Sequence, residues 1–336
     1  LLASSAASDV YKRQTYMNPI ISLIAPAYNV EKYIEACVHS CENQDLPRDS
    51  YEIIIVNDGS TDSTYSTIER LSGVYENIRI VTQKNQGLSV ARNNGFKLAR
   101  GKYVWFIDSD DCISSNCLGK CLEIMERDDL DALVVAPSVP FREIFPYKFD
   151  SEADVSKVYD GESFLLDSGF FVVGAWCYIF KRQFWHNNNF EFYPGISYED
   201  TQLIPWAIAH CMRIAGLIKF SCYDYIQRNG SIMNSPVNQH KIKSIAMIVN
   251  SYLDYSAQIS SERLKNYFLE NSTRQYISGI KMSVQSERGD VNVFLNYIRK
   301  YPTKVGKFPY SLYQLFVLKY PLIFAKLLRL LKKYDS

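Results

Sequence analysis

The sequence lacks several patterns that would assign it to a class of protein at once. No window of about eighteen apolar residues is free of charged side chains, so no membrane-spanning helix is expected. No two cysteines have the spacing CxxC, and four histidines are too few to suggest a zinc site. Lys and Arg number 37 against 36 Asp and Glu, and the net charge of +1 provides no overall field that would attract nucleic acid.

A secretory signal and a disulfide framework are also missing. Residues 1–16 have neither the basic start nor the sustained apolar stretch of a signal peptide, and we expect them to be a non-native or disordered leader before Met17. The cysteines are scattered, and Cys37 and Cys41, on either side of His39, have the spacing of two small buried helix residues. We therefore expect free cysteines in the core and a cytoplasmic protein.

The sequence does contain a regular alternation of strand-like and helix-like segments between Pro19 and Ala136. Apolar runs predict strands at residues 20–25, 51–56, 78–81, 103–107 and 132–135. Helical spacing predicts helices at residues 31–41, 63–71, 88–99 and 116–127. Such an alternation requires crossover connections and a mostly parallel sheet, with ligands in the crevice beyond the carboxyl ends of the strands.

The turn after the first predicted strand contains no glycine. Its sequence is APAYN, residues 25–29, where a dinucleotide-binding fold carries GxGxxG. Close approach of this backbone to a pyrophosphate is therefore not expected, which argues against a nicotinamide or flavin enzyme. The same turn lacks the glycine-rich, basic phosphate loop that a sugar nucleotidyltransferase would need.

Asp58 follows the second predicted strand, in the segment VNDGSTDST. A tight turn and a helix N-cap supplied by Ser60, Thr61 or Asp62 explain the polar cluster. This interpretation leaves Asp58 free at the crevice, where its carboxylate could accept a hydrogen bond from a ligand N–H group such as that of a nucleobase.

The segment QKNQGLSVARNNG follows the third predicted strand. Gln86, Gly87 and Ser89 can form a turn and cap the next helix, whose N-terminal amides then favour an anion. Arg92 and Lys84 lie near the same helix end, where a solvated basic face is the alternative interpretation.

Three carboxylates, those of Asp108, Asp110 and Asp111, follow the buried strand YVWFI. Like charges at such a place repel one another and lose solvation, and helix capping explains only one of them. A divalent cation resolves the repulsion, since Mg²⁺ characteristically binds through one or two carboxylates together with substrate phosphates. The pattern therefore predicts a site for Mg²⁺ or Mn²⁺ and a diphosphate.

Four segments in the same order and spacing resemble the family 2 glycosyltransferases of the GT-A fold. They are PAYNVEKYIEACVHSC, IIIVNDGSTDST, NQGLSVARNNGFKLARGKYVWFIDSDD and GISYEDTQLIPWA, within residues 19–236. The resemblance implies an α/β fold with a Rossmann-like, mostly parallel sheet flanked by helices. It also implies transfer of a sugar, with inversion at the anomeric carbon, from a nucleotide-diphosphate-sugar that is commonly a UDP-sugar.

The resemblance carries donor-binding roles to matching positions. Tyr28, Asn29 and Asp58 would line the nucleoside pocket, and Asp108 would contact the ribose while Asp110 holds the metal. The full set implied for the nucleotide-sugar is Pro26, Tyr28, Asn29, Asp58, Lys84, Gly87, Arg92, Asp108, Ser109, Arg228 and Ser231.

The resemblance also implies that Asp200 is the catalytic base, with Glu199 and Trp176 as candidates for the acceptor side. Each has a structural alternative. Asp200 could have a structural role alone, as the partner of Ser197 in a capping box at the start of the next helix. Trp176 lies in a strongly aromatic region, where a tryptophan is more often part of the core.

We predict a catalytic domain at residues 17–236, with a nucleotide-sugar-binding half at 17–136 and an acceptor-binding half at 137–236. Residues 237–336 are predicted to form a helical C-terminal region. Its apolar and basic segment at 312–331 could lie in a membrane interface at the inner face of the cell membrane, pack on the protein's own core or form a homodimer.

The resemblance suggests bacterial surface polysaccharide synthesis, with a glycan or lipid-linked acceptor. Two other functions remain open from the sequence. One is a sugar nucleotidyltransferase, and the other is a sugar-nucleotide-binding module without turnover.

Overall fold

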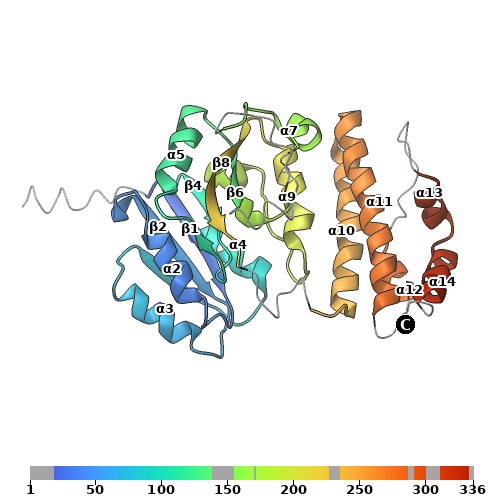
Figure 1. The fold of residues 1–336 in the computed structure, drawn as a ribbon, viewed down its shortest axis with the longest axis horizontal. Helices are drawn as coiled ribbons and strands as arrows, with labels where there is room; N and C mark the ends of the chain where they lie inside the picture. The colour runs from blue at the N-terminus through green and yellow to red at the C-terminus, as the bar shows by residue number, and fades with distance from the viewer. Residues whose placement is uncertain are drawn as a thin grey trace, which may run out of the picture.

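The computed structural model describes residues 19–137, 155–169, 172–226, 235–286, 291–299 and 311–332. From left to right, Figure 1 shows an α/β part that begins with β1 and β2, then α9, the helix pair α10 and α11, and finally α13 and α14. No helix within these ranges combines the length and the apolarity that crossing a bilayer would require.

The described strands form a single eight-stranded sheet in the order β3-β2-β1-β4-β7-β6-β8-β5. Their bounds are β1 Ile21–Ala27, β2 Tyr51–Asn57, β3 Ile78–Thr82, β4 Tyr103–Phe106, β5 Cys112–Ile113, β6 Ala132–Pro137, β7 Tyr178–Lys181 and β8 Ile214–Asp224. β3, β2, β1 and β4 are parallel neighbours, and β6 is parallel to β8. The predicted mostly parallel sheet is confirmed, and β7, which runs antiparallel to both of its neighbours, was not predicted.

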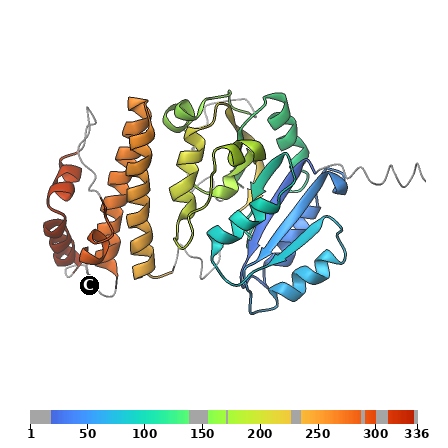
Figure 2. The ribbon, with the colours of Figure 1, turned by 180° about the vertical axis from the view of Figure 1, so that it is seen from behind.

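Helices cover both faces of the sheet. Figure 1 shows α2 and α5 in front of it, and Figure 2, from behind, shows the teal helix α4 on the opposite face. The bounds in this part are α2 Ile34–Glu42, α3 Thr64–Ser72, α4 Leu88–Leu98, α5 Leu118–Arg127, α7 Gly161–Asp167, α8 Arg182–Asn187 and α9 Glu199–Ala209. All seven residues of β1 and of β2 are buried, as expected for strands covered on both sides.

The four helices predicted at residues 31–127 are confirmed as α2, α3, α4 and α5, and the largest shift of a start is that of α2. α2 begins at Ile34 rather than at residue 31. Glu31 is held instead by the loop after β2, since its backbone N–H donates to Asp62 Oδ2 at 3.2 Å and its carboxylate accepts from the N–H of Ser63 at 2.9 Å.

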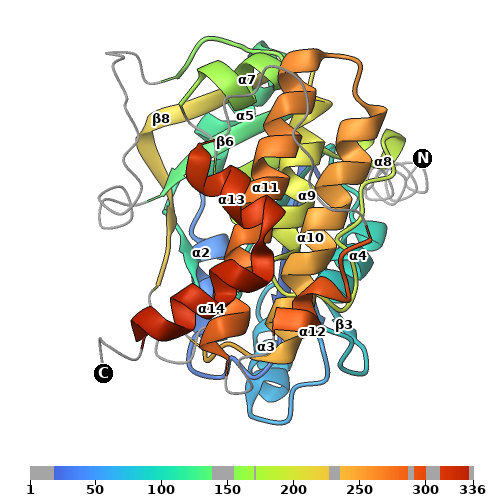
Figure 3. The same ribbon diagram turned by 90° about the vertical axis from the view of Figure 1, so that its right-hand side faces the viewer.

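The C-terminal helices stack outward from α9. Their bounds are α10 Gln239–Gln258, α11 Glu262–Gln285, α12 Val291–Leu295, α13 Leu312–Lys319 and α14 Pro321–Lys332. α10 and α11 pack along each other, and Figure 3 shows α13 and α14 lying across α11 on its outer side.

The eight cysteines are free, and seven of them are buried. Cys37 and Cys41 lie on the buried face of α2, as their spacing predicted. Within the described part of the chain, no group of three or more His, Cys, Asp or Glu side chains is arranged to hold a metal ion by itself.

A candidate active site at the carboxyl ends of the strands

The carboxyl ends of β1, β2 and β4 meet at one edge of the sheet. The parallel register of β1 and β2 places Ala27 opposite Asn57, and the backbone N–H of Asp58 donates to Ala27 O at 2.8 Å. β4 ends at Phe106 on the other side of β1, two residues before Asp108. Asp58 and Asp108 therefore follow strands on the two sides of β1, at the same edge of the sheet.

A cavity of about 520 Å³ opens at this edge. Its lining residues come from the end of β1, from the segments that follow β1, β2, β3, β4 and β8, and from the start of α4: Pro26, Ala27, Tyr28, Val30, Asp58, Asn85, Gly87, Leu88, Ala91, Asp108, Ser109, Asp110, Asp111 and Tyr225. Seven of the residues predicted for the donor or the metal are among them: Pro26, Tyr28, Asp58, Gly87, Asp108, Ser109 and Asp110. Asn29, Lys84 and Arg92 are not lining residues, and Arg228 and Ser231 lie outside the described residues.

The other seven lining residues were not predicted to bind the donor or the metal, and among them Asn85 and Tyr225 carry polar side chains that no prediction named. Asn85 directly follows the predicted Lys84, whose side chain is exposed on the same loop. Tyr225 comes just after the end of β8, and the alternation of Tyr223 and Tyr225 in the sequence is the signal that could have indicated a tyrosine at the site.

Asp58 is fully engaged with the loop after β3 rather than free at the crevice. Its Oδ1 accepts from Gln83 Nε2 at 2.7 Å and from the N–H of Gln86 at 2.8 Å, and its Oδ2 accepts from the N–H of Gly87 at 2.8 Å. The expectation of an unoccupied carboxylate is therefore wrong. Asp58 is the residue that fixes this loop against the end of β2 while it lines the cavity.

The start of α4 depends on glycine and on this contact. Gly87 is its N-cap with φ at 88°, a left-handed conformation that glycine adopts without a steric penalty. Ser89 was expected to cap the helix, but its hydroxyl is buried and has no hydrogen-bond partner in the described part of the chain. The amide of Gly87 is satisfied from Asp58 instead.

The loop after β1 is closed by side chains from the loop after β2. The N–H groups of Asn29 and Val30 donate to Ser60 Oγ at 3.1 Å and to Thr64 Oγ1 at 2.8 Å. Asn29, with φ at 52°, returns a contact through its Oδ1, which accepts from the N–H of Thr61 at 2.8 Å. These amides occupy the place where a phosphate-binding loop would have its donors, so the structure agrees with the absence of such a loop here.

The polar cluster after β2 also caps α3, and Asp62, one of the three candidates, supplies the side-chain contact. Ser63 is the N-cap, and Asp62 Oδ1 accepts from the N–H of Thr64 at 3.0 Å. The Ser60 and Thr61 positions serve the loop after β1 and not the helix.

Arg92 lies buried behind the cavity and joins two acids from distant parts of the chain. Its two terminal nitrogens donate to Asp108 Oδ1 and to Glu199 Oε1, each at 2.6 Å, and its guanidinium lies 5.1 Å from the ring centroid of Phe192. Burial alone would lower the pKa of Arg92, but the carboxylates of Asp108 and Glu199 outweigh it and hold the pKa above its usual range. Arg92 therefore stays charged and connects the end of β4 to the start of α9.

Asp200 lies in the first turn of α9, next to this ion pair. Burial raises its pKa to about 7, and the neighbouring charge of Glu199 adds to the effect while Arg92 opposes it. The structural alternative, a capping box of Ser197 and Asp200, is not formed. The N-cap is Tyr198 in a left-handed conformation without a side-chain cap, and Asp200 Oδ1 accepts from the adjacent N–H of Thr201, at 2.7 Å.

Asp111 differs from its two neighbours in the acidic cluster because it is bound within the fold. Its Oδ2 accepts from the hydroxyl of Tyr223 at 2.9 Å, and its Oδ1 accepts from the N–H of Ile226 at 2.8 Å. Burial, and after it the charge of Asp108, raise the pKa of Asp111 to about 8. Asp111 therefore favours its protonated form more than a free carboxyl does, which reduces the negative charge of the cluster.

Trp176 lies in an aromatic stack rather than on an open surface. Its ring packs on Tyr223 with centroids 4.4 Å apart and on Tyr225 with centroids 5.9 Å apart. The side chain is buried, as is that of Glu199. Of this stack, Tyr225 is the member that reaches the cavity wall.

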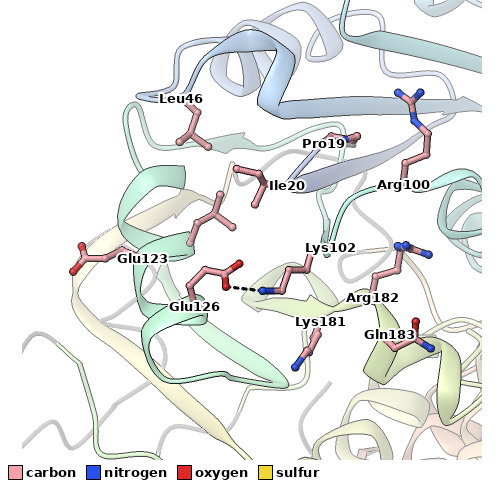
Figure 4. A pocket seen from close by; sticks show the side chains of 11 residues that line it. Pro19, Ile20, Leu46, Arg100, Lys102, Glu123, Glu126, Lys181, Arg182 and Gln183 are labelled. Atoms are coloured by element: carbon pink, nitrogen blue, oxygen red, sulfur yellow. Dashed lines mark hydrogen bonds and ion pairs between the residues drawn. The ribbon is translucent and has the colours of Figure 1, made fainter. Parts of the chain in front are cut away.

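A second cavity, of about 680 Å³, lies at the opposite edge of the sheet, where β1 begins. Figure 4 shows its charged residues, including Lys102, Glu126 and Arg182. Lys102 pairs with Glu126 at 2.5 Å, and Arg182 Nε donates to the carbonyl of Gly101 at 2.6 Å. This cavity is larger, but two acids line it, Glu123 and Glu126, and Glu126 is paired with Lys102. Four acids line the cavity at the carboxyl edge, so we place the active site there.

The fold and the acid-lined crevice define a glycosyltransferase of the GT-A class. The family model described as glycosyl transferase family 2 matches residues 22–223. The chain belongs to glycosyl transferase family 2, and it is a transferase enzyme.

The chain is similar to named proteins of the same kind. It is 28% identical over 295 residues to the uncharacterized glycosyltransferase EpsJ of Bacillus subtilis, covering 85% of each chain. It is 42% identical over 112 residues to the putative teichuronic acid biosynthesis glycosyltransferase TuaG of the same organism, covering 33% of this chain and 44% of TuaG. Residues 1–349 of S. aureus TarS, in a structure with UDP-GlcNAc, share the fold with a TM-score of 0.61 and 21% identity, over 82% of this chain and 90% of that one.

Replacing Arg92 with alanine should destabilise the protein strongly, because the buried carboxylate of Glu199 and the half-buried carboxylate of Asp108 would lose their shared cation. We expect the free energy of unfolding to fall by about 3–5 kcal/mol, measured by chemical denaturation. Arg263→Ala is the matched control. Arg263 pairs with Glu162 and Asp167 at the surface, where ion pairs contribute little. Equal unfolding curves for the two variants would contradict the proposed role of Arg92.

Proposed function

We propose that the protein is an inverting glycosyltransferase that moves a sugar from a nucleotide-diphosphate-sugar to a hydroxyl group of a glycan or lipid-linked acceptor. A UDP-sugar is the favoured donor, and bacterial polysaccharide synthesis is the favoured process. The observation that carries this proposal is the convergence of Asp58, Asp108 and Asp110 on one cavity, with Asp108 linked through Arg92 to the helix that carries Asp200. The UDP-GlcNAc complex of TarS and the naming of TuaG support the choice of donor and process.

The nucleoside would occupy the part of the cavity between the loops after β1 and β2. Pro26, Tyr28 and Asp58 line that part, and Tyr28, with 48% of its side chain exposed, can close over a base. Asn29 would act from behind this wall, since its side chain holds the Thr61 loop. The diphosphate would lie toward Gly87 and the start of α4, whose N-terminal amides favour negative charge, with Lys84 at the rim and Arg228 and Ser231 as further candidates.

The acids at the end of β4 fit a divalent cation, Mn²⁺ or Mg²⁺. Asp110 and Asp108 line the cavity with hard oxygen ligands, and the third acid, Asp111, is bound within the fold. A set of one or two carboxylates suits a cation that takes its remaining ligands from the donor diphosphate and from water. When bound, such a cation neutralises the negative charge that develops on the departing nucleotide diphosphate.

Asp200 would serve as the general base. Its ionised carboxylate would take the proton of the acceptor hydroxyl as that oxygen attacks the anomeric carbon and the bond to the diphosphate breaks. This single displacement inverts the anomeric configuration. Glu199 is engaged with Arg92, and Trp176 is buried, so they would act on the acceptor through their neighbours Asp200 and Tyr225.

Asp200→Asn should lower kcat by about 10²- to 10⁴-fold while donor binding persists, because only the proton acceptor is removed. The assay measures UDP released from a panel of UDP-sugars with Mn²⁺, with and without glycan acceptors. A binding module would bind the UDP-sugar without releasing UDP. A nucleotidyltransferase would instead form a UDP-sugar and pyrophosphate from UTP and a sugar phosphate. Full activity of the variant would remove Asp200 from the role of base.

The pH dependence of kcat should show the titration of Asp200. A general base works only when it is deprotonated, so a pKa near 7 means that the rate falls about tenfold per unit as the pH drops below 7 and levels off above it. The profile is measured at saturating donor and metal, so that changes in their binding do not contribute. A rate that stays constant between pH 5 and 7, which would be about 50-fold above expectation at pH 5, would exclude this assignment.

Asp110→Asn should abolish the metal-dependent part of UDP binding, because the substitution removes an anionic oxygen from the predicted cation site. Calorimetry with UDP, in the presence and absence of Mn²⁺, measures this directly. Asp131→Asn is the control, since Asp131 is an acid distant from the cavity that binds the backbone of Met212. Undiminished Mn²⁺-dependent binding by Asp110→Asn would show that the cation is held elsewhere.

A further inference from the structure

The outer face of α14 leaves large apolar side chains in solvent. Val317, Phe324 and Ala325 are buried where α13 and α14 pack on α11. The opposite side of α14 exposes four apolar residues by about half of their surface: Leu322 54%, Ile323 52%, Leu327 46% and Leu330 48%. A short helix that keeps one apolar face unpacked is a candidate interaction surface.

These residues form one stripe. Ile323, Leu327 and Leu330 have the i, i+4, i+7 spacing that places side chains on the same side of a helix, and Leu322 extends the stripe at its start. Burying a side chain of this size is worth about 1.5–3 kcal/mol when it is fully removed from water. A partner that covers the stripe would recover a substantial part of that free energy.

Basic residues flank the stripe, and acids are absent. Lys319, Lys326 and Arg329 are exposed, and the sequence contains no Asp or Glu from Ser311 to Lys332. Elsewhere the chain is balanced, with a net charge of +1, so this concentration of cations is a local feature. Figure 3 shows α14 on the outer side of α11, where no other described helix covers it.

We propose that this face of α14 docks on an anionic lipid membrane, with the stripe in the interface and the basic residues against the lipid phosphates. Charge complementarity decides between this partner and a second copy of the chain. In a symmetric dimer through the same face, Lys326 and Arg329 of one copy would face the same cations of the other, and this segment of the sequence has no acid to pair with them. An anionic bilayer satisfies both the apolar and the cationic side chains, and α14 lies along the surface rather than across the membrane.

The full-length protein should sediment with vesicles of phosphatidylcholine mixed with phosphatidylglycerol, and weakly with phosphatidylcholine alone. The charge-reversed variant Lys326→Glu/Arg329→Glu should lose at least about tenfold in vesicle affinity, because each basic residue near an anionic surface contributes about fivefold. Ile323→Ser/Leu327→Ser should lose a similar factor by removing apolar contact. High salt should weaken the binding of the unmodified protein.

Matched controls separate docking from general changes in charge or hydrophobicity. Lys120→Glu/Arg127→Glu makes the same change in net charge on α5, and Val74→Ser/Met212→Ser removes two exposed apolar side chains elsewhere. Both controls should bind vesicles as the unmodified protein does. All variants should keep its melting temperature, since the substituted side chains are exposed.

Three results would overturn the proposal. They are no binding of the unmodified protein to anionic vesicles, undiminished binding by both α14 variants, and a dimer in light scattering that Ile323→Ser/Leu327→Ser dissociates while vesicle binding stays absent. The vesicle assay uses neither donor nor acceptor, so its outcome is independent of the proposed glycosyl transfer.

Discussion

The guanidinium of Arg92 reaches from α4 to the end of β4 and to the start of α9, and its two ion pairs join segments that lie far apart in the sequence. The buried guanidinium depends on both carboxylates, because Arg92 and Glu199 have been removed from water and Asp108 is half-buried at the cavity wall. The position of Asp108 at the cavity and the position of the first turn of α9 are therefore set by the same side chain. The donor side and the base side of the site cannot shift independently without separating a buried ion pair.

The acids of the site divide into two groups with different tasks. Asp58 and Asp111 accept hydrogen bonds from backbone amides and so fix the loops that form the cavity walls. Asp108 and Asp110 line the space between those walls. A cluster that looks uniformly ligand-binding in the sequence is thus partly scaffold, and the repulsion expected from three adjacent carboxylates is reduced because the buried Asp111 favours its protonated form.

Local patterns predicted the strands and helices of the first half well, because buried parallel strands and amphipathic helices have distinct periodicities. The reversal of β7 escaped prediction, since strand direction depends on how the chain returns to the sheet and leaves no mark in a four-residue segment. The pairing of Arg92 with Glu199 and the engagement of Asp58 with Gln83 likewise depend on tertiary contacts between distant positions. Sequence motifs indicated which residues gather at the edge of the sheet. The structure was needed to distinguish the acids that hold the loops in place from the acids that are available to a ligand.

The closure of the loop after β1 by Ser60 and Thr64 has a consequence for how a ligand would be received. Main-chain groups that are already hydrogen-bonded have little conformational freedom left to lose when a ligand arrives. The backbone of this wall is therefore ordered during folding. Ligand binding there would not have to offset the entropy cost of ordering it. Discrimination at this end of the cavity would then depend on shape and on a few side chains, which substitution can alter without rebuilding the loop.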